Sequence, residues 1–212
     1  SGNHRYLHSF PTRRSSDLST GGGILIGSSN GVVRDCIIEY NFAGDFGGGL
    51  YGSSNYIENN IIRNNYASYG GGVYCPNGNA CTIKNCVIEN NSSYSSGGGI
   101  YTANLSNTVY IIGNTINANT SPQAGGIYVQ RLVQVKNNTI SNNVSTLNGA
   151  GMFVYNSNGE ITNNTIFNNS CNGNGGGVYI YNFSPIFTNN TIVENHADND
   201  NNSTGSGGGF FI

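Results

Sequence analysis

The chain of 212 residues predicts an all-β solenoid, a parallel β-helix of about seven coils with 24–28 residues each. Two motifs alternate along the sequence, and recurrence at a fixed period of roughly 20–50 residues indicates stacked structural units. Each unit is rich in β-branched residues and is interrupted by Gly, Asn and Ser, which favours short strands and turns. One unit cannot bury its apolar side chains alone, so successive coils must stack.

The first motif is a run of glycines followed by an aliphatic and an aromatic residue. Four complete copies begin at Gly47, Gly70, Gly97 and Gly175, and looser copies begin at Ala124 and Gly149. Equivalent residues of stacked coils lie above one another, and such a set is called a column here. The aliphatic position predicts an inward-facing column of Leu50, Val73, Ile100, Ile127, Met152 and Val178.

The second motif is an aliphatic segment that ends in asparagine. Its central isoleucines are separated by 24, 26, 28, 24, 26 and 26 residues, and they predict a second apolar column: Ile38, Ile62, Ile88, Ile116, Ile140, Ile166 and Ile192. A third column begins the motif with Val33, Ile57, Ile83, Ile111, Val135, Ile161 and Phe187. Each buried aliphatic side chain contributes roughly 1.5–3 kcal/mol, so the three columns predict a continuous core.

Asparagine closes every copy of the second motif. The column contains Asn41, Asn65, Asn91, Asn119, Asn143, Asn169 and Asn195. Asparagine tolerates left-handed backbone conformations and bonds to the local backbone, and stacked amides can bond from rung to rung. These residues are therefore interpreted as structural.

Charged residues alternate in sign along two columns. One column contains Arg34, Glu58 and Lys84, and the other contains Glu39, Arg63 and Glu89. Paired carboxylates could indicate glycosidase chemistry. The alternation favours surface ion pairs instead, because each neighbour about 4.8 Å away carries the opposite charge.

The aromatic position of the glycine motif supplies the candidate binding residues. Strand alternation turns its aliphatic neighbours inward, which predicts an exposed aromatic stripe: Tyr51, Tyr74, Tyr101, Tyr128, Phe153 and Tyr179. Tyr155 and Tyr181 are expected to widen it. Exposed aromatic rings can bind sugar rings or a partner surface. The alternative is that they only stack on one another across the sheet.

Other candidate sites are weaker. Asp198 and Asp200 lie in an oxygen-rich loop that could bind calcium, but the EF-hand pattern fails and a solvated loop is the alternative. Calcium is the only cofactor that the sequence suggests. Neighbouring His196 does not form a recognisable triad or zinc site. Cys75 and Cys81 bracket one turn, and this spacing allows a local disulfide.

Composition constrains partners and location. Only 8% of residues are charged, against roughly 25% in an average domain. Residues 1–18 match no repeat column, and His8–Leu18 reads like a translated sequencing-adapter primer, so no fold is expected there; a basic arm is the alternative. The net charge is −2. The acidic balance argues against nucleic acid, and low charge with abundant Asn, Gly, Ser and Thr suggests an extracellular or outer-surface protein.

With these motifs, residues 19–212 resemble the right-handed parallel β-helix repeat family, and the repeats are similar to passenger repeats of bacterial polymorphic outer-membrane proteins. The resemblance implies an adhesin-like or carbohydrate-binding scaffold whose partner is a polysaccharide or a cell-surface glycan. Many family members are polysaccharide lyases or hydrolases, but the signatures Asn-Thr-Asp, Gly-His-Gly and Arg-Ile-Lys do not occur in the sequence. No catalytic residue is therefore assigned. Because both ends interrupt a repeat, a fragment of an enzyme whose catalytic coils lie outside it remains the alternative, and no membrane segment is predicted.

Overall fold

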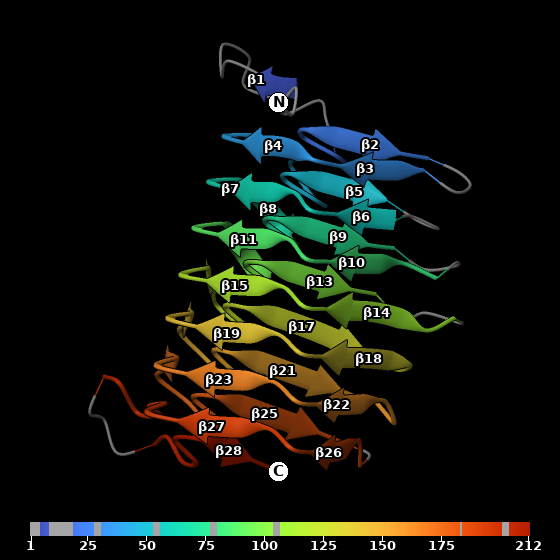
Figure 1. Ribbon diagram of the computed structural model, residues 1–212. Coiled ribbons are helices and arrows are strands. Elements are labelled where there is room, and N and C mark those ends of the chain that lie inside the picture. The colour runs from blue at the N-terminus through green and yellow to red at the C-terminus, as the bar shows by residue number, and fades with distance from the viewer. Residues whose placement is uncertain are drawn as a thin grey trace.

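The computed structural model describes the backbone of residues 5–8 and all of residues 19–27, 31–52, 56–76, 80–103, 107–182, 184–200 and 204–212. The regular elements of these residues are strands β1 to β28. They form four sheets, A to D, in which every pairing is parallel and joins successive coils. Figure 1 shows the strands stacked as rungs between the two chain ends. The predicted all-β parallel solenoid is confirmed.

Each coil passes through the sheets in the order D, A, B and C, although the short strands of sheet B begin only at β8. Sheet D contains β3 (Val32–Arg34), β6 (Tyr56–Glu58), β10 (Thr82–Lys84), β14 (Val109–Ile112), β18 (Val133–Lys136), β22 (Glu160–Thr162) and β26 (Ile186–Thr188). Sheet A contains β1 (Arg5–His8), β4 (Cys36–Glu39), β7 (Ile61–Arg63), β11 (Val87–Glu89), β15 (Thr115–Asn117), β19 (Thr139–Ser141), β23 (Thr165–Phe167) and β27 (Thr191–Val193).

Sheet B contains β8 (Tyr66–Tyr69), β12 (Ser92–Ser96), β16 (Thr120–Ser121), β20 (Val144–Ser145) and β24 (Ser170–Cys171). Sheet C contains β2 (Ile24–Ile26), β5 (Leu50–Gly52), β9 (Val73–Cys75), β13 (Ile100–Thr102), β17 (Ile127–Gln130), β21 (Met152–Tyr155), β25 (Val178–Tyr181) and β28 (Phe210–Phe211).

The core lies inside the coils and consists of the predicted columns. In sheet A, Ile62 pairs with Ile38 and Ile88, and in sheet C, Ile100 pairs with Val73 and Ile127. The Val33 column follows the same rule in sheet D. Nearly all members of the three columns are buried, and only Phe187 and Ile192 are partly buried. All three predicted columns are confirmed.

The predicted asparagine ladder is present. The Nδ2 group of Asn119 donates to Asn143 Oδ1 at 3.1 Å and to the Ile88 carbonyl at 2.9 Å, and its backbone N–H also donates to Asn143 Oδ1. The same pattern repeats along the column. The left-handed conformation belongs to the preceding residue instead, such as Asn142 with φ 56°. In each Asn-Asn pair, the first residue therefore adopts the left-handed conformation of the bend, and the second residue forms the hydrogen bonds of the ladder.

A second ladder lies at the turn between sheets D and A. Asn114 Nδ2 donates to Asn138 Oδ1 at 3.0 Å, and Asn138 Nδ2 donates to Asn164 Oδ1 at 3.0 Å. Cys86 occupies this column, where it is 1% exposed and its N–H donates to Asn114 Oδ1. Cys36, in the same column, is only partly buried. Cysteine here replaces an asparagine of the ladder.

The register confirms both predicted columns of charged residues. Arg63 Nε donates to Glu39 Oε2 at 2.7 Å, and Lys84 Nζ lies 3.3 Å from Glu58 Oε1. The hydrogen bond that Arg63 donates to Glu39, together with the negative charge of Glu39, raises the pKa of Arg63. A further pair between Lys136 and Glu160 on sheet D was not predicted.

The backbone of residues 5–8 forms β1, which pairs with β4 through Leu7 and Ile38. These four residues therefore join sheet A, although no fold was expected for residues 1–18. The rest of that segment lies outside the described residues, so its origin as an adapter sequence stays a prediction.

Candidate functional site

The aromatic residues of the glycine motif form one continuous stack on the outer side of sheet C. Their inward neighbours, such as Ile100 and Ile127, belong to the core. Ring centroids of successive coils are 4.7–5.4 Å apart, from Tyr51 on Tyr74 to Phe153 on Tyr179. Phe211 continues the stack beyond Tyr179 at 5.2 Å. The aromatic stripe predicted from the repeat is thus one column, extended by one ring.

The prediction that this stripe is exposed is wrong for half of its members. Tyr74, Tyr128 and Phe153 are only 8%, 7% and 4% exposed, and the other three are half-buried. The cause is that each ring is covered by the rings of the coils above and below it. Aromatic rings outside the stripe also cover its sides. For example, the ring centroid of Phe46 lies 4.7 Å from that of Tyr74. The sequence pattern predicted the direction of these side chains, but it did not predict that neighbouring rings would bury one another.

The column that flanks the stripe on the sheet B side changes its chemistry along the solenoid. In the early coils it contains Phe46 and Tyr69, which contact Tyr74 and Tyr101. In later coils its members are Ser96, Gln123, Asn148 and Asn174. The side of the stripe is therefore filled by rings at one end and lined by amides at the other.

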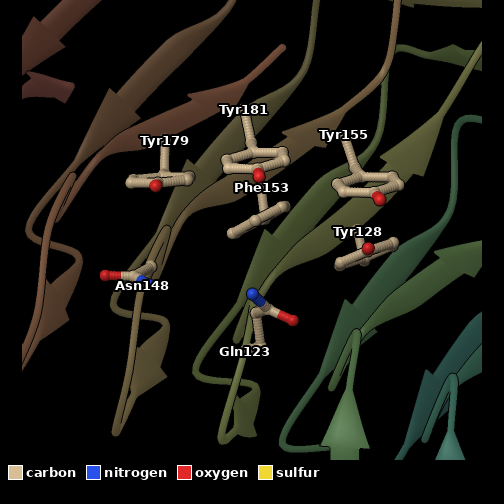
Figure 2. Close-up of a pocket in the computed structure, with 7 residues that line it drawn as sticks. All are labelled: Gln123, Tyr128, Asn148, Phe153, Tyr155, Tyr179 and Tyr181. Atoms are coloured by element: carbon tan, nitrogen blue, oxygen red, sulfur yellow. The ribbon is translucent and has the colours of Figure 1, made fainter. Parts of the chain in front are cut away.

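Where the flanking column is polar, the surface contains a groove of about 520 Å³. Figure 2 shows five aromatic rings with the side chains of Gln123 and Asn148 beside them. The lining residues are Gln123, Tyr128, Asn148, Phe153, Tyr155, Tyr179 and Tyr181. Tyr155 and Tyr181, which the sequence predicted to widen the stripe, stack in a second row at 5.5 Å with an interplanar angle of 3°. Tyr181 is 45% exposed.

Besides the tyrosine hydroxyls, two side-chain amides provide polar groups in the groove. Asn148 Oδ1 accepts the backbone N–H of Asn174 at 2.7 Å, which fixes the orientation of the amide and leaves Nδ2 as a donor. Within the described residues, no hydrogen bond occupies the side-chain amide of Gln123. The groove thus combines aromatic surface with a few placed polar groups, which is the usual composition of a small-molecule site. Sequence reasoning missed Gln123 and Asn148, because their column has no constant residue type.

Burial changes the acid–base behaviour of the stripe. It raises the pKa of Tyr74 and of Tyr128 to about 12 and raises that of Tyr101 further, because the phenolate loses its hydration. Tyr101 Oη also accepts a hydrogen bond from Gln130 Nε2 at 3.1 Å. These tyrosines therefore remain uncharged hydroxyl groups throughout the neutral range.

We expect stability to fall as pH rises from about 10 to about 12, the interval between the ordinary tyrosine pKa and the raised pKa of Tyr74. Folding favours the protonated phenol, so this contribution is complete below the lower value and is lost as pH rises through the higher one. Melting temperatures measured across this range, together with phenolate absorbance, test it. Tyr74→Phe should flatten the dependence, whereas Tyr94→Phe, at a ring that is 74% exposed, should not. Identical pH profiles of both variants and the parent would contradict the expectation.

The structure does not gather the other predicted residues into a site. Asp198 is partly buried with φ 57°, and Asp200 and His196 are exposed. Among the described residues, no group of three or more His, Cys, Asp or Glu could hold a metal ion. Calcium at Asp198 and Asp200 therefore stays a prediction. In the part of the chain that the structure describes, no helix is long and apolar enough to cross a membrane.

The cysteines are free thiols in the structure. Cys75 and Cys81 are buried in the core, and the local disulfide that their spacing allows is not formed. The pKa of Cys75 is raised well above its ordinary value. The hydrogen bond with Cys81 is the larger cause, and burial of the thiol is the second. A buried thiol in this state is poorly nucleophilic.

A family model described as "Right handed beta helix region" matches residues 6–116. This match covers just over half of the chain, and the described residues form a parallel β-solenoid. The protein therefore belongs to the right-handed β-helix family. A search of curated proteins and a search of solved structures found no match.

Proposed function

We propose that this β-helix is a carbohydrate-binding, adhesin-like module of an extracellular or cell-surface protein. The observation that carries the proposal is the groove on sheet C, where five aromatic rings lie beside two side-chain amides. Sugars present C–H faces that pack on aromatic rings and hydroxyl groups that need hydrogen-bond partners. The groove offers both kinds of contact within a single concave surface.

We propose that the ligand contacts the later coils and not the whole length of the stripe. Rings in the middle of the stripe have both faces covered by neighbouring rings, so they support the surface and offer little contact to a ligand. Tyr181 combines a partly exposed ring with a place in the groove. It is therefore the residue that a sugar is proposed to contact in the groove, together with Tyr155 of the same row.

The location on a cell surface is proposed from composition and family resemblance. Only 8% of the residues are charged, and 32 are glycine. In this setting the solenoid is a rigid spacer that presents the groove on one face.

We expect Tyr181→Ala to weaken binding to a glycan about tenfold, equivalent to about 1.4 kcal/mol. A glycan array first identifies a bound sugar, and titration calorimetry then compares the parent and the variant. The control is Tyr94→Ala, because Tyr94 is 74% exposed and lies on β12 in sheet B, outside the groove. Equal affinities of all three proteins would refute the groove as the binding site, and so would an array on which the parent binds nothing.

A further inference from the structure

We infer that the groove selects uncharged glycans and rejects polymers of uronic acids. The inference rests on the proposed function and names the substrate class of that same site. It follows from the uncharged lining of the groove and from the kind of hydrogen-bonding groups that the lining offers.

No residue that lines the groove carries a charge. A uronate that enters would lose part of the hydration of its carboxylate, and burying a charge without a partner is costly. The ion pairs that the structure describes lie elsewhere: Glu39–Arg63 on sheet A and Glu58–Lys84 and Lys136–Glu160 on sheet D. Arg131 is exposed in the turn after β17 and does not line the groove. The lining therefore provides no cation for an acidic sugar.

The polar groups of the groove match hydroxyl groups instead. A sugar hydroxyl both donates and accepts, and the amide of Gln123 and the phenols of the tyrosines do the same. Asn148 contributes a donor, because its Oδ1 is already bonded to the backbone of the next coil. Tyr128 keeps its proton far above neutral pH, since burial raises its pKa to about 12. Every polar contact available to the ligand is thus a neutral one.

The groove also limits the length of the bound segment. Its lining extends from Gln123, which precedes β17, to Tyr181 in β25, so it spans three coils. Two steps between coils correspond to about 9.6 Å along the solenoid. This length suits a short oligosaccharide segment that lies along the axis and packs on the second row of rings.

The test compares uncharged and acidic polymers under one set of conditions. The probes are galactomannan, xyloglucan, polygalacturonate and fully methyl-esterified polygalacturonate, in which the carboxylate charge is removed. We expect at least one uncharged polymer to bind at least tenfold more tightly than polygalacturonate. Gln123→Lys places a cation in the groove and should raise affinity for polygalacturonate at least tenfold. Tyr94→Lys, which adds the same charge on sheet B, should leave it unchanged.

The outcomes separate the inference from the proposed function. Tight binding of polygalacturonate by the parent that is lost in Tyr181→Ala would overturn the inference and keep the sugar-binding groove. Equal gains from Gln123→Lys and Tyr94→Lys would overturn it as well, because general charge and not the groove would then set the preference. If none of the four polymers binds and the array is also blank, the proposed function and the inference both fail.

Discussion

Replacing Asn143 with alanine is expected to lower the free energy of unfolding by about 3–6 kcal/mol. The Asn143 side chain is fully buried, and its Oδ1 accepts hydrogen bonds from the backbone N–H and the Nδ2 group of Asn119. Its Nδ2 donates to the Ile116 carbonyl and to Asn169 Oδ1. Alanine removes these four bonds and leaves the backbone N–H of Asn119 without its Asn143 acceptor, and a buried polar group that loses its partner costs roughly 1–3 kcal/mol. The loss corresponds to a melting temperature roughly 10–20 °C lower.

The adjacent Asn142 supplies the matched control for this prediction. Asn142 is exposed and left-handed, and the same place one coil earlier is occupied by Ala118, also left-handed with φ 53°. Alanine at position 142 therefore repeats a residue that the solenoid already contains there, and the expected cost is about 1 kcal/mol. Thermal melts of the two variants test the comparison. Equal losses of stability in the two variants would show that the ladder hydrogen bonds of Asn143 contribute no more to stability than the side chain of Asn142 at the bend.

Replacing Gly71 with alanine is expected to cost about 3 kcal/mol or more and to reduce the yield of folded protein. An added Cβ would lie 2.6 Å from the Gly98 carbonyl oxygen and closer still to that of Ser92. Both obstacles are backbone atoms of the next coil, so no side chain can rotate away. The coils would have to separate locally, and forcing extra volume into a packed interior costs about 1–3 kcal/mol or more.

Gly27→Ala is the control for the steric explanation. Gly27 is exposed, and a Cβ added there would meet no heavy atom within 4 Å. Its φ lies outside the left-handed region, so alanine should be neutral or stabilise by about 0.4–1 kcal/mol through the unfolded chain. Chemical denaturation of both variants measures the difference. A Gly71→Ala protein as stable as the parent would mean that contact between the coils does not require glycine.

Periodicity made the interior of this protein predictable from its sequence. The recurrence of the central isoleucines every 24–28 residues fixes the register, because one isoleucine must stack on the next to stay buried. Strand alternation then assigns every neighbouring residue to the inside or the outside. The same logic predicted the columns of charged residues, since opposite charges recur at one position of the repeat.

The groove was not predictable in this way, because it depends on a column that breaks the pattern. Phe46 and Tyr69 pack against the stripe in early coils, whereas Gln123 and Asn148 line a groove beside it later. A change along a column carries no periodic signal. The exposure of the stripe was also overestimated, because alternation gives the direction of Tyr128 but not the cover that Tyr101 and Phe153 provide.

The two asparagine ladders give the solenoid an electric dipole along its axis. Along the first ladder, and from Asn114 onward in the second, the amide of one coil donates to the Oδ1 atom of the following coil, as from Asn119 to Asn143 and from Asn114 to Asn138. Strand dipoles within sheets largely cancel, but amide dipoles aligned head to tail add, as in an α-helix. A fold without a helix in its described residues thus acquires a macrodipole. A coil that continues either ladder must therefore orient its asparagine amide in the same direction.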